Sequence, residues 1–239
     1  MTHPLHSPGR RFPTGRGTCL VAMVVPLVTA VNASCPIDPE RPETIQLQAC
    51  RPTPISPAEK AIVLAALPTE GEVMNLGKSD IEKLDAVRHV LRFHDRDKVY
   101  DLKVVDVPQA WTGLYRRGVL LISLPALKML TSGELVAIVA HEVGHEYVWE
   151  ALEAARAERD EARLRSLELA CDAIAAITLT RIGVPPDRLT SALDRVFTYN
   201  HRHFGISRNH ASYPDLNERR AVVARAARVS GVEQNRGRP

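Results

Sequence analysis

The chain has 239 residues, of which 45% are hydrophobic and 25% are charged, and these proportions are those of an ordinary soluble globular protein. The formal net charge is +3, and Lys and Arg are scattered along the chain, which argues against nucleic acid as a partner. Without the apolar N-terminal segment, about 200 residues remain, which is enough for one domain with a substantial core.

The first 33 residues have the layout of a secretory signal. A stretch with three arginines precedes the apolar run Cys19–Val31, which is too short to span a bilayer and contains Pro26. We therefore predict a signal peptide over residues 1–33, with an uncleaved anchor as the alternative, and an exported protein, periplasmic or secreted. Membrane association is expected only if this segment stays uncleaved or is lipidated.

Residues 34–56 are rich in proline, which predicts an extended linker or a surface arm. In an oxidising compartment, Cys35 and Cys50 could form a disulfide across this stretch. The folded domain is then expected over residues 57–239.

Hydrophobic periodicity predicts a mostly helical domain with a small sheet. Helical spacing covers residues 58–68, opened by Ser56-Pro57, and Ser79–Phe93. Residues 99–107 and 118–125 read as strands, and residues 109–118 as a strand end and turn, so the sheet is expected to be antiparallel in part. Further helices are predicted over residues 132–149, 150–166, 166–183, 187–199 and 216–229. The fold class is therefore α+β, with an antiparallel or mixed sheet.

The sharpest feature is the string H-E-V-G-H, from His141 to His145. It lies in a predicted helix that begins with the capping-box pattern of Thr131 and Glu134. Positions i and i+4 project from one face of a helix, so both imidazoles can reach one metal ion. Glu142 lies beside the pair and can hold a metal-bound water. This arrangement is the chemical basis of the H-E-x-x-H motif.

A catalytic zinc needs a third protein ligand and one open position for water. Glu168 is the best candidate, because it and Asp172 precede an apolar stretch that predicts a buried helix, and a buried carboxylate needs a cation or a metal. Asp172 would then orient a ligating histidine through its other ring nitrogen. Taken alone, a solvated Glu168 in a charged run is the alternative.

The separation in sequence between His145 and Glu168 places a condition on a metal site that uses both residues. A straight helix from His145 to Glu168 would separate them by about 34 Å. The chain must therefore reverse between residues 150 and 164, where no Gly or Pro marks a turn.

Together, H-E-V-G-H and the string E-L-A-C-D from Glu168 to Asp172 resemble the H-E-x-x-H…E-x-x-x-D pattern of the HtpX and CAAX prenyl protease family of gluzincin metallopeptidases. The resemblance covers about residues 97–220, including the strand–turn–strand before the ligand helix and the late string S-Y-P-D-L-N-E-R. It implies a zincin-like metallopeptidase domain with one zinc per chain, bound by His141, His145 and Glu168. It also implies that Glu142 is the general base in the hydrolysis of peptide bonds.

Two positions depart from the family pattern. Tyr213 stands where the family usually places His before Pro, and Gln109 where it often has Asn. A phenol can donate a hydrogen bond, so Tyr213, together with Arg219, could still steady the transition-state oxyanion. His210, three residues earlier, could substitute for the missing histidine, and a lone surface histidine is the alternative. The family's membrane members carry long apolar spans, and none follows residue 31, so the chain resembles a soluble, exported relative.

We therefore predict a zinc metalloendopeptidase that hydrolyses exported or misfolded proteins through a Glu142-activated, zinc-bound water. The peptide or unfolded-protein substrate is expected to bind as an added strand along the edge offered by residues 118–125. The alternative is a zinc-stabilised protein-binding or chaperone-like module with little or no proteolysis, which the intact Glu142 argues against. The oligomeric state stays open.

Overall fold

The computed structural model describes residues 37–67, 71–206 and 211–236, and the side chains of the last helix as far as Gly231. The predicted signal peptide, Cys35 and His210 lie outside the described residues. Within the described part of the chain, we find no helix that combines the length and the apolar composition of a membrane span.

The chain order of the elements is helix-rich with one short run of strands, which confirms the α+β class. The described elements are α1 (Pro57–Ala65), α2 (Lys78–Phe93), β1 (Asp101–Val105), β2 (Thr112–Tyr115), β3 (Val119–Ser123), α3 (Leu124–Met129), α4 (Ser132–Tyr147), α5 (Trp149–Glu158), α6 (Glu161–Arg181), α7 (Asp187–Phe204) and α8 (Leu216–Arg236). A 3-10 turn at Pro42–Thr44 precedes them.

The sheet has the strand order β1-β3-β2 and is mixed: β3 runs parallel to β1 and antiparallel to β2. The turn from β2 to β3 places Arg116 and Arg117 at positive φ (44° and 58°), as primed hairpin turns require. Because β3 is paired on both sides, the expectation that residues 118–125 offer a free edge is wrong. The free edge on that side of the sheet belongs to β2.

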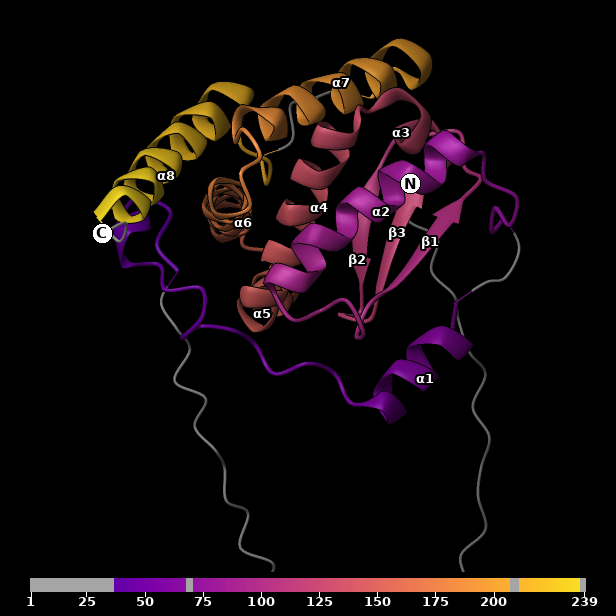
Figure 1. Cartoon of the computed structure of the whole chain (residues 1–239), viewed down its shortest axis with the longest axis horizontal. Helices are drawn as coiled ribbons and strands as arrows, with labels where there is room; N and C mark the ends of the chain where they lie inside the picture. The colour runs from indigo at the N-terminus through magenta and orange to yellow at the C-terminus, as the bar shows by residue number, and fades with distance from the viewer. Residues whose placement is uncertain (1–36, 68–70, 207–210, 237–239) are drawn as a thin grey trace, which may run out of the picture. The chain divides into compact units, whose positions relative to one another are not determined.

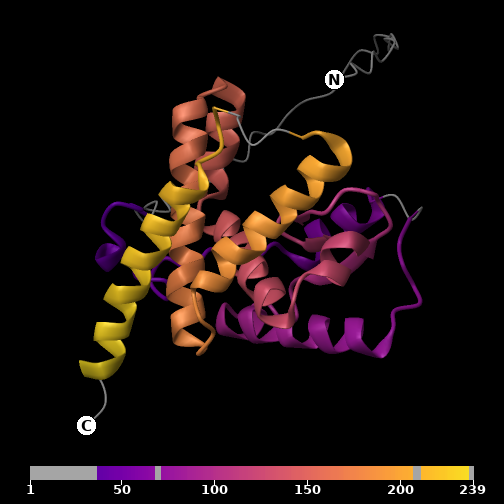
Figure 2. The ribbon, with the colours of Figure 1, turned by 90° about the horizontal axis from the view of Figure 1, so that it is seen from above.

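Helix α4 lies at the centre of the helical layers and packs against α2, α6 and α7, while α6 packs in turn against α8 (Figures 1 and 2). In Figure 1, α6 is seen end-on beside α4. Almost all of α4 is buried, including its polar residues His141 and Glu142. The motif helix is therefore part of the core, and charged groups on it must find partners inside the protein.

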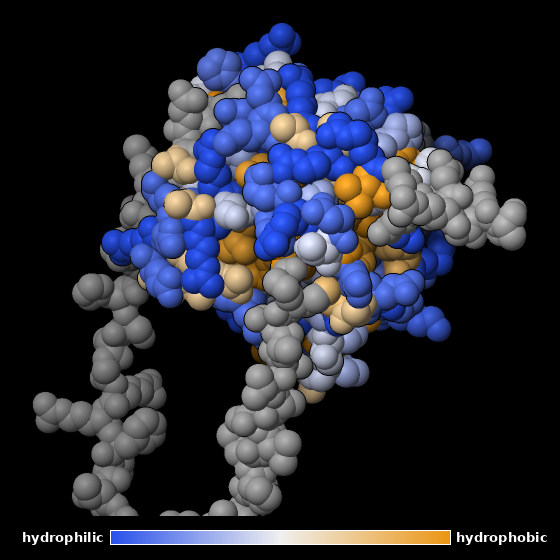
Figure 3. Space-filling view, turned by 90° about the vertical axis from the view of Figure 1, so that its left-hand side faces the viewer, coloured by the Kyte–Doolittle hydropathy of each residue, from blue (hydrophilic) through white to orange (hydrophobic). Residues whose placement is uncertain are grey.

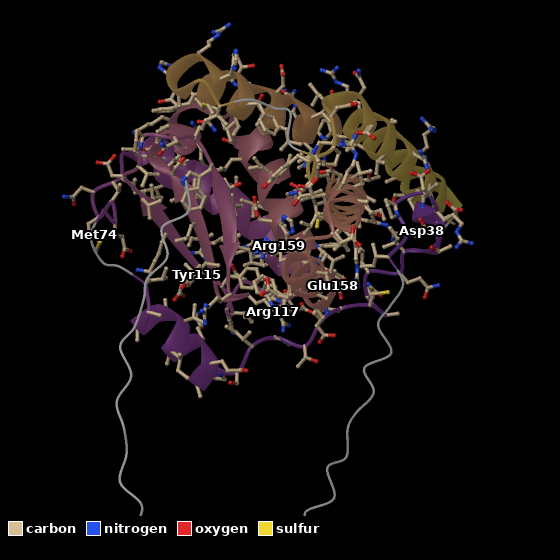
Figure 4. All side chains as sticks on the ribbon, turned by 180° about the vertical axis from the view of Figure 1, so that it is seen from behind. Asp38, Met74, Tyr115, Arg117, Glu158 and Arg159 are labelled. Atoms are coloured by element: carbon tan, nitrogen blue, oxygen red, sulfur yellow. The ribbon has the colours of Figure 1, made fainter. Side chains whose placement is uncertain are left out.

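The reversal that the ligand set requires is present between α5 and α6. Helix α5 ends at Glu158, and the next residue, Arg159, adopts the left-handed conformation (φ 57°). Asp160 then caps α6 by accepting a hydrogen bond from the backbone N–H of Arg163 at 2.9 Å. Figure 4 labels Glu158 and Arg159 at this turn. An arginine thus fills a position that usually takes Gly or Asn, which is why the sequence did not mark it.

The proline-rich stretch before α1 is an arm that packs on the domain. Ile45 and Leu47 are buried in the main core, and the Arg96 guanidinium donates to the carbonyl of Pro52 at 2.5 Å. Cys50 is disulfide-bonded, while Cys35, its predicted partner, lies outside the described residues. The face turned to the viewer in Figure 3 is mainly hydrophilic, with small separate apolar patches.

Candidate metal centre

Helix α4 carries the H-E-x-x-H string and is firmly anchored at its start. Thr131 and Glu134 form the predicted capping box, in which Oε2 of Glu134 accepts from the Thr131 backbone N–H at 2.8 Å. Glu134 also accepts a hydrogen bond from Ser191 on α7 at 2.6 Å. These contacts fix the rotation of α4, and with it the direction in which His141 and His145 project.

The structure brings His141, His145 and Glu168 together, with one ligand atom from each within 4.8 Å of the others. Nε2 of His141 lies 3.4 Å from one carboxylate oxygen of Glu168, and Nε2 of His145 lies 3.7 Å from the other. Two donors that each bind a tetrahedral zinc at about 2.1 Å lie about 3.4 Å apart. The three side chains therefore fit a single metal ion, and this group could hold one.

The two ligand-bearing helices meet at a glycine. A Cβ added to Gly144 would lie 3.0 Å from Cα, 3.1 Å from Cβ and 3.1 Å from the carbonyl oxygen of Cys171. Gly144 thus permits the backbone of α6 to approach α4 closely, between the level of Glu168 and that of Asp172. The glycine of H-E-V-G-H therefore has a structural role that the motif alone does not reveal.

Behind the three candidate ligands lies a second group of polar side chains. Oδ1 of Asp172 accepts from Nδ1 of His141 at 2.8 Å, as predicted for an orienting carboxylate. Arg219, which is 1% exposed, donates to Asp172 at 3.0 Å and to Glu168 at 2.9 Å. Sγ of Cys171 lies 3.4 Å from Nδ1 of His145. Each of the candidate ligands is thus held by a buried neighbour.

Burial and the contacts between the members of this cluster set their pKa values. Burial alone would lower the pKa of His141, but hydrogen bonds with Asp172 and Glu168 raise this pKa to about 10. Burial likewise would raise the pKa of Glu168, but the His141 hydrogen bond and nearby positive charges hold this pKa well below its usual range. Burial lowers the pKa of His145, which favours the neutral imidazole that binds metals. His141 therefore carries a positive charge in this arrangement, in contact with the carboxylates of Asp172 and Glu168.

Glu142 lies at the edge of the cluster. One of its carboxylate oxygens is 4.0 Å from Nε2 of His145, and the other accepts a hydrogen bond from the Thr112 hydroxyl at 2.8 Å. Thr112 belongs to the edge strand β2, so the candidate base is tied to the sheet. Sequence reasoning missed Thr112, because no motif links it to Glu142.

The two other predicted catalytic residues, Tyr213 and Arg219, have different surroundings: Tyr213 is half-exposed and Arg219 is buried. Tyr213 is 47% exposed, and partial burial together with the nearby negative charges of Glu168 and Glu142 raises the pKa of its phenol. The guanidinium of Arg219 contacts the carboxylates of Glu168 and Asp172 from inside the protein. Arg219 is therefore placed to position a candidate ligand.

No protein-family model matches the chain, and no curated protein matches its sequence. The resemblance to the HtpX and CAAX prenyl protease family therefore stays a prediction that rests on the motifs themselves.

Proposed function

We propose that the chain is a zinc-dependent metalloendopeptidase with its metal on His141, His145 and Glu168. One observation carries the proposal: three side chains of the right chemistry converge from two helices, and an intact Glu142 lies beside them. Nitrogen and carboxylate donors in this combination suit zinc, and a set of three protein ligands suits a catalytic site with an open position. A structural zinc site would be closed by a fourth protein ligand.

In the proposed reaction, a zinc ion in this group would polarise the attacking water and the substrate carbonyl. Glu142 takes the proton of the water through the oxygen that faces His145 and returns it to the amine nitrogen that leaves. The hydrogen bond from Thr112 occupies the other oxygen of Glu142 and keeps the carboxylate in this orientation. Tyr213, which is half-exposed and feels the charges of Glu168 and Glu142, is the proposed donor for the developing oxyanion.

The proposed peptide substrate binds along β2. The carbonyl of Trp111 faces β3, where it accepts from Ser123 at 3.0 Å, so by alternation the backbone groups of Thr112 and Leu114 point away from β3. Just before them, the Asn200 side chain already pairs with the backbone N–H and carbonyl of Ala110, at 2.9 and 2.7 Å. An extended peptide can therefore add as a strand at Thr112 and Leu114, next to Glu142.

The test compares the full chain with its Glu142→Gln variant on an unfolded protein substrate, with the zinc content of both measured. Cleavage by the wild type alone, at equal zinc content and abolished by a chelator, would support the proposal. Equal zinc content with no cleavage by either protein would instead support the binding or chaperone-like alternative. Equal cleavage by both proteins would refute the role of Glu142.

A further inference from the structure

Helix α6 turns three polar side chains toward α4. Glu168, Cys171 and Asp172 have the i, i+3, i+4 spacing that places side chains on one face of a helix. Glu168 belongs to the candidate metal group, and Asp172 contacts His141 at 2.8 Å. Cys171, between them, contacts His145 through its sulfur at 3.4 Å. The three residues thus act on three different parts of one site.

The two histidines have the same arrangement in the cluster. Each points Nε2 toward Glu168, at 3.4 Å from His141 and 3.7 Å from His145, so each Nδ1 faces away from the metal position. A histidine that binds a metal through one nitrogen carries a proton on the other and donates it to an acceptor, which fixes the ring. Asp172 is that acceptor for His141, and Cys171 is the group placed to be that acceptor for His145.

Cys171 is not placed to bind the metal itself. Its sulfur contacts the ring nitrogen that faces away from Glu168, and among the described residues it is not a member of the group whose ligand atoms converge. The thiol is fully buried, and the close approach of Gly144 holds the backbone of Cys171 against α4. Its position is therefore fixed by helix packing, which suits a group that orients a neighbour.

We propose that Cys171 is a positioning residue of the metal centre: its sulfur accepts the Nδ1–H hydrogen bond of His145 and keeps Nε2 of that ring directed at the ion. This inference rests on the proposed function, because it requires a metal at the site. A thiol is a weak acceptor, whereas the Asp172 carboxylate is a charged one. His145 is therefore the less firmly held of the two histidine ligands, and a stronger acceptor at position 171 would hold it better.

The test measures metal binding rather than proteolysis. Zinc affinity of the metal-stripped full chain is determined by competition with a chelator, and the cobalt-loaded protein is examined by its visible absorption, which reports the ligand geometry. The variants are Cys171→Ala, which removes the acceptor, and Cys171→Ser, which replaces it with a hydroxyl of similar size. Ile174→Val is the matched control, because it removes a methyl group from the buried part of the same helix.

We expect Cys171→Ala to weaken zinc binding by about 10- to 100-fold and to change the cobalt spectrum. Cys171→Ser should keep or improve on wild-type affinity, and Ile174→Val should leave both readouts unchanged. Wild-type affinity and spectrum in Cys171→Ala would overturn the positioning role while leaving the metal site intact. Equal weakening in all three variants would show a packing effect and would also overturn it. Absence of zinc binding by the wild type would overturn the metal site, and the role of Cys171 with it.

Discussion

Replacing Gly144 with alanine should impair metal binding far more than it impairs folding. The added Cβ would lie 3.0 Å from Cα of Cys171, whereas ordinary contacts of a Cβ begin at 3.4 Å. The atoms it meets include backbone atoms of α6, which cannot rotate away. Helix α6 must therefore move by about 0.4 Å, whereas a metal site requires its ligands within about 0.2 Å of their proper distances.

The effect on stability is the balance of two opposing terms. Overpacking of a core costs about 1–3 kcal/mol. Alanine in place of glycine inside a helix recovers about 1 kcal/mol. Gly144→Ala should therefore lower the free energy of unfolding of the metal-free protein by about 2 kcal/mol or less. Glu168 moves with α6 while both histidines stay on α4, so the zinc affinity should fall by about tenfold or more.

The assay is zinc competition with a chelator, combined with urea unfolding of the metal-free protein. Gly133→Ala is the matched control on the same helix, because its Cβ would meet only the Arg188 side chain, at an ordinary 3.8 Å. That variant should bind zinc as the wild type does. Wild-type zinc affinity in Gly144→Ala would refute the reasoning that the close contact of α4 and α6 sets the geometry of the ligands.

Three further predictions concern the base, the protons and the core. Thr112→Val should lower the rate of peptide cleavage with zinc content unchanged, because Glu142 loses its hydrogen bond from the Thr112 hydroxyl. Thr112→Ser should restore the rate. Equal rates in all three proteins would contradict the role of Thr112 in orienting Glu142. Zinc affinity should rise about tenfold per pH unit between pH 6 and 8, because zinc displaces the proton of His141, whose pKa is about 10 without metal. Calorimetric titrations in buffers of different ionisation enthalpy would detect the released proton. An affinity that does not change with pH would exclude proton release from His141. Burial lowers the pKa of His94 from 6.5 to about 3, so the stability linked to this histidine is complete above pH 6.5 and is lost as the pH falls toward 3. Urea unfolding across this range should therefore show a flatter pH dependence for His94→Gln than for the wild type, and parallel curves would refute the assignment.

The sequence was informative where chemistry or periodicity is local. The capping box at Thr131 and the i, i+4 spacing of His141 and His145 are confirmed, because one helix determines both. The pairing of Glu168 with these histidines required a tertiary argument, namely that a buried carboxylate needs a partner, and the structure brings the three together. The bounds of α2 and α4 follow their apolar periodicity to within a few residues.

What could not be predicted depends on contacts between elements that are distant in the sequence. The order of the strands decides that β2, and not residues 118–125, carries the free edge. Thr112 reaches Glu142 only because β2 lies against α4. The short helix α3 was missed because six residues beginning with Leu124 are too few to show a helical period. The reversal between residues 150 and 164 was expected, but its position at Arg159 could not be predicted because arginine rarely adopts the left-handed backbone found there.

The zinc content of the Glu168→Ala variant tests the central claim most directly. The full-length wild type should hold one zinc ion per chain after dialysis, and Glu168→Ala should lose it while keeping its helical circular dichroism. Glu161→Ala, an exposed substitution in the first turn of the same helix, serves as the control and should retain the metal. Tight binding of zinc by Glu168→Ala, or no zinc in the wild type, would contradict a metal centre built by α4 and α6.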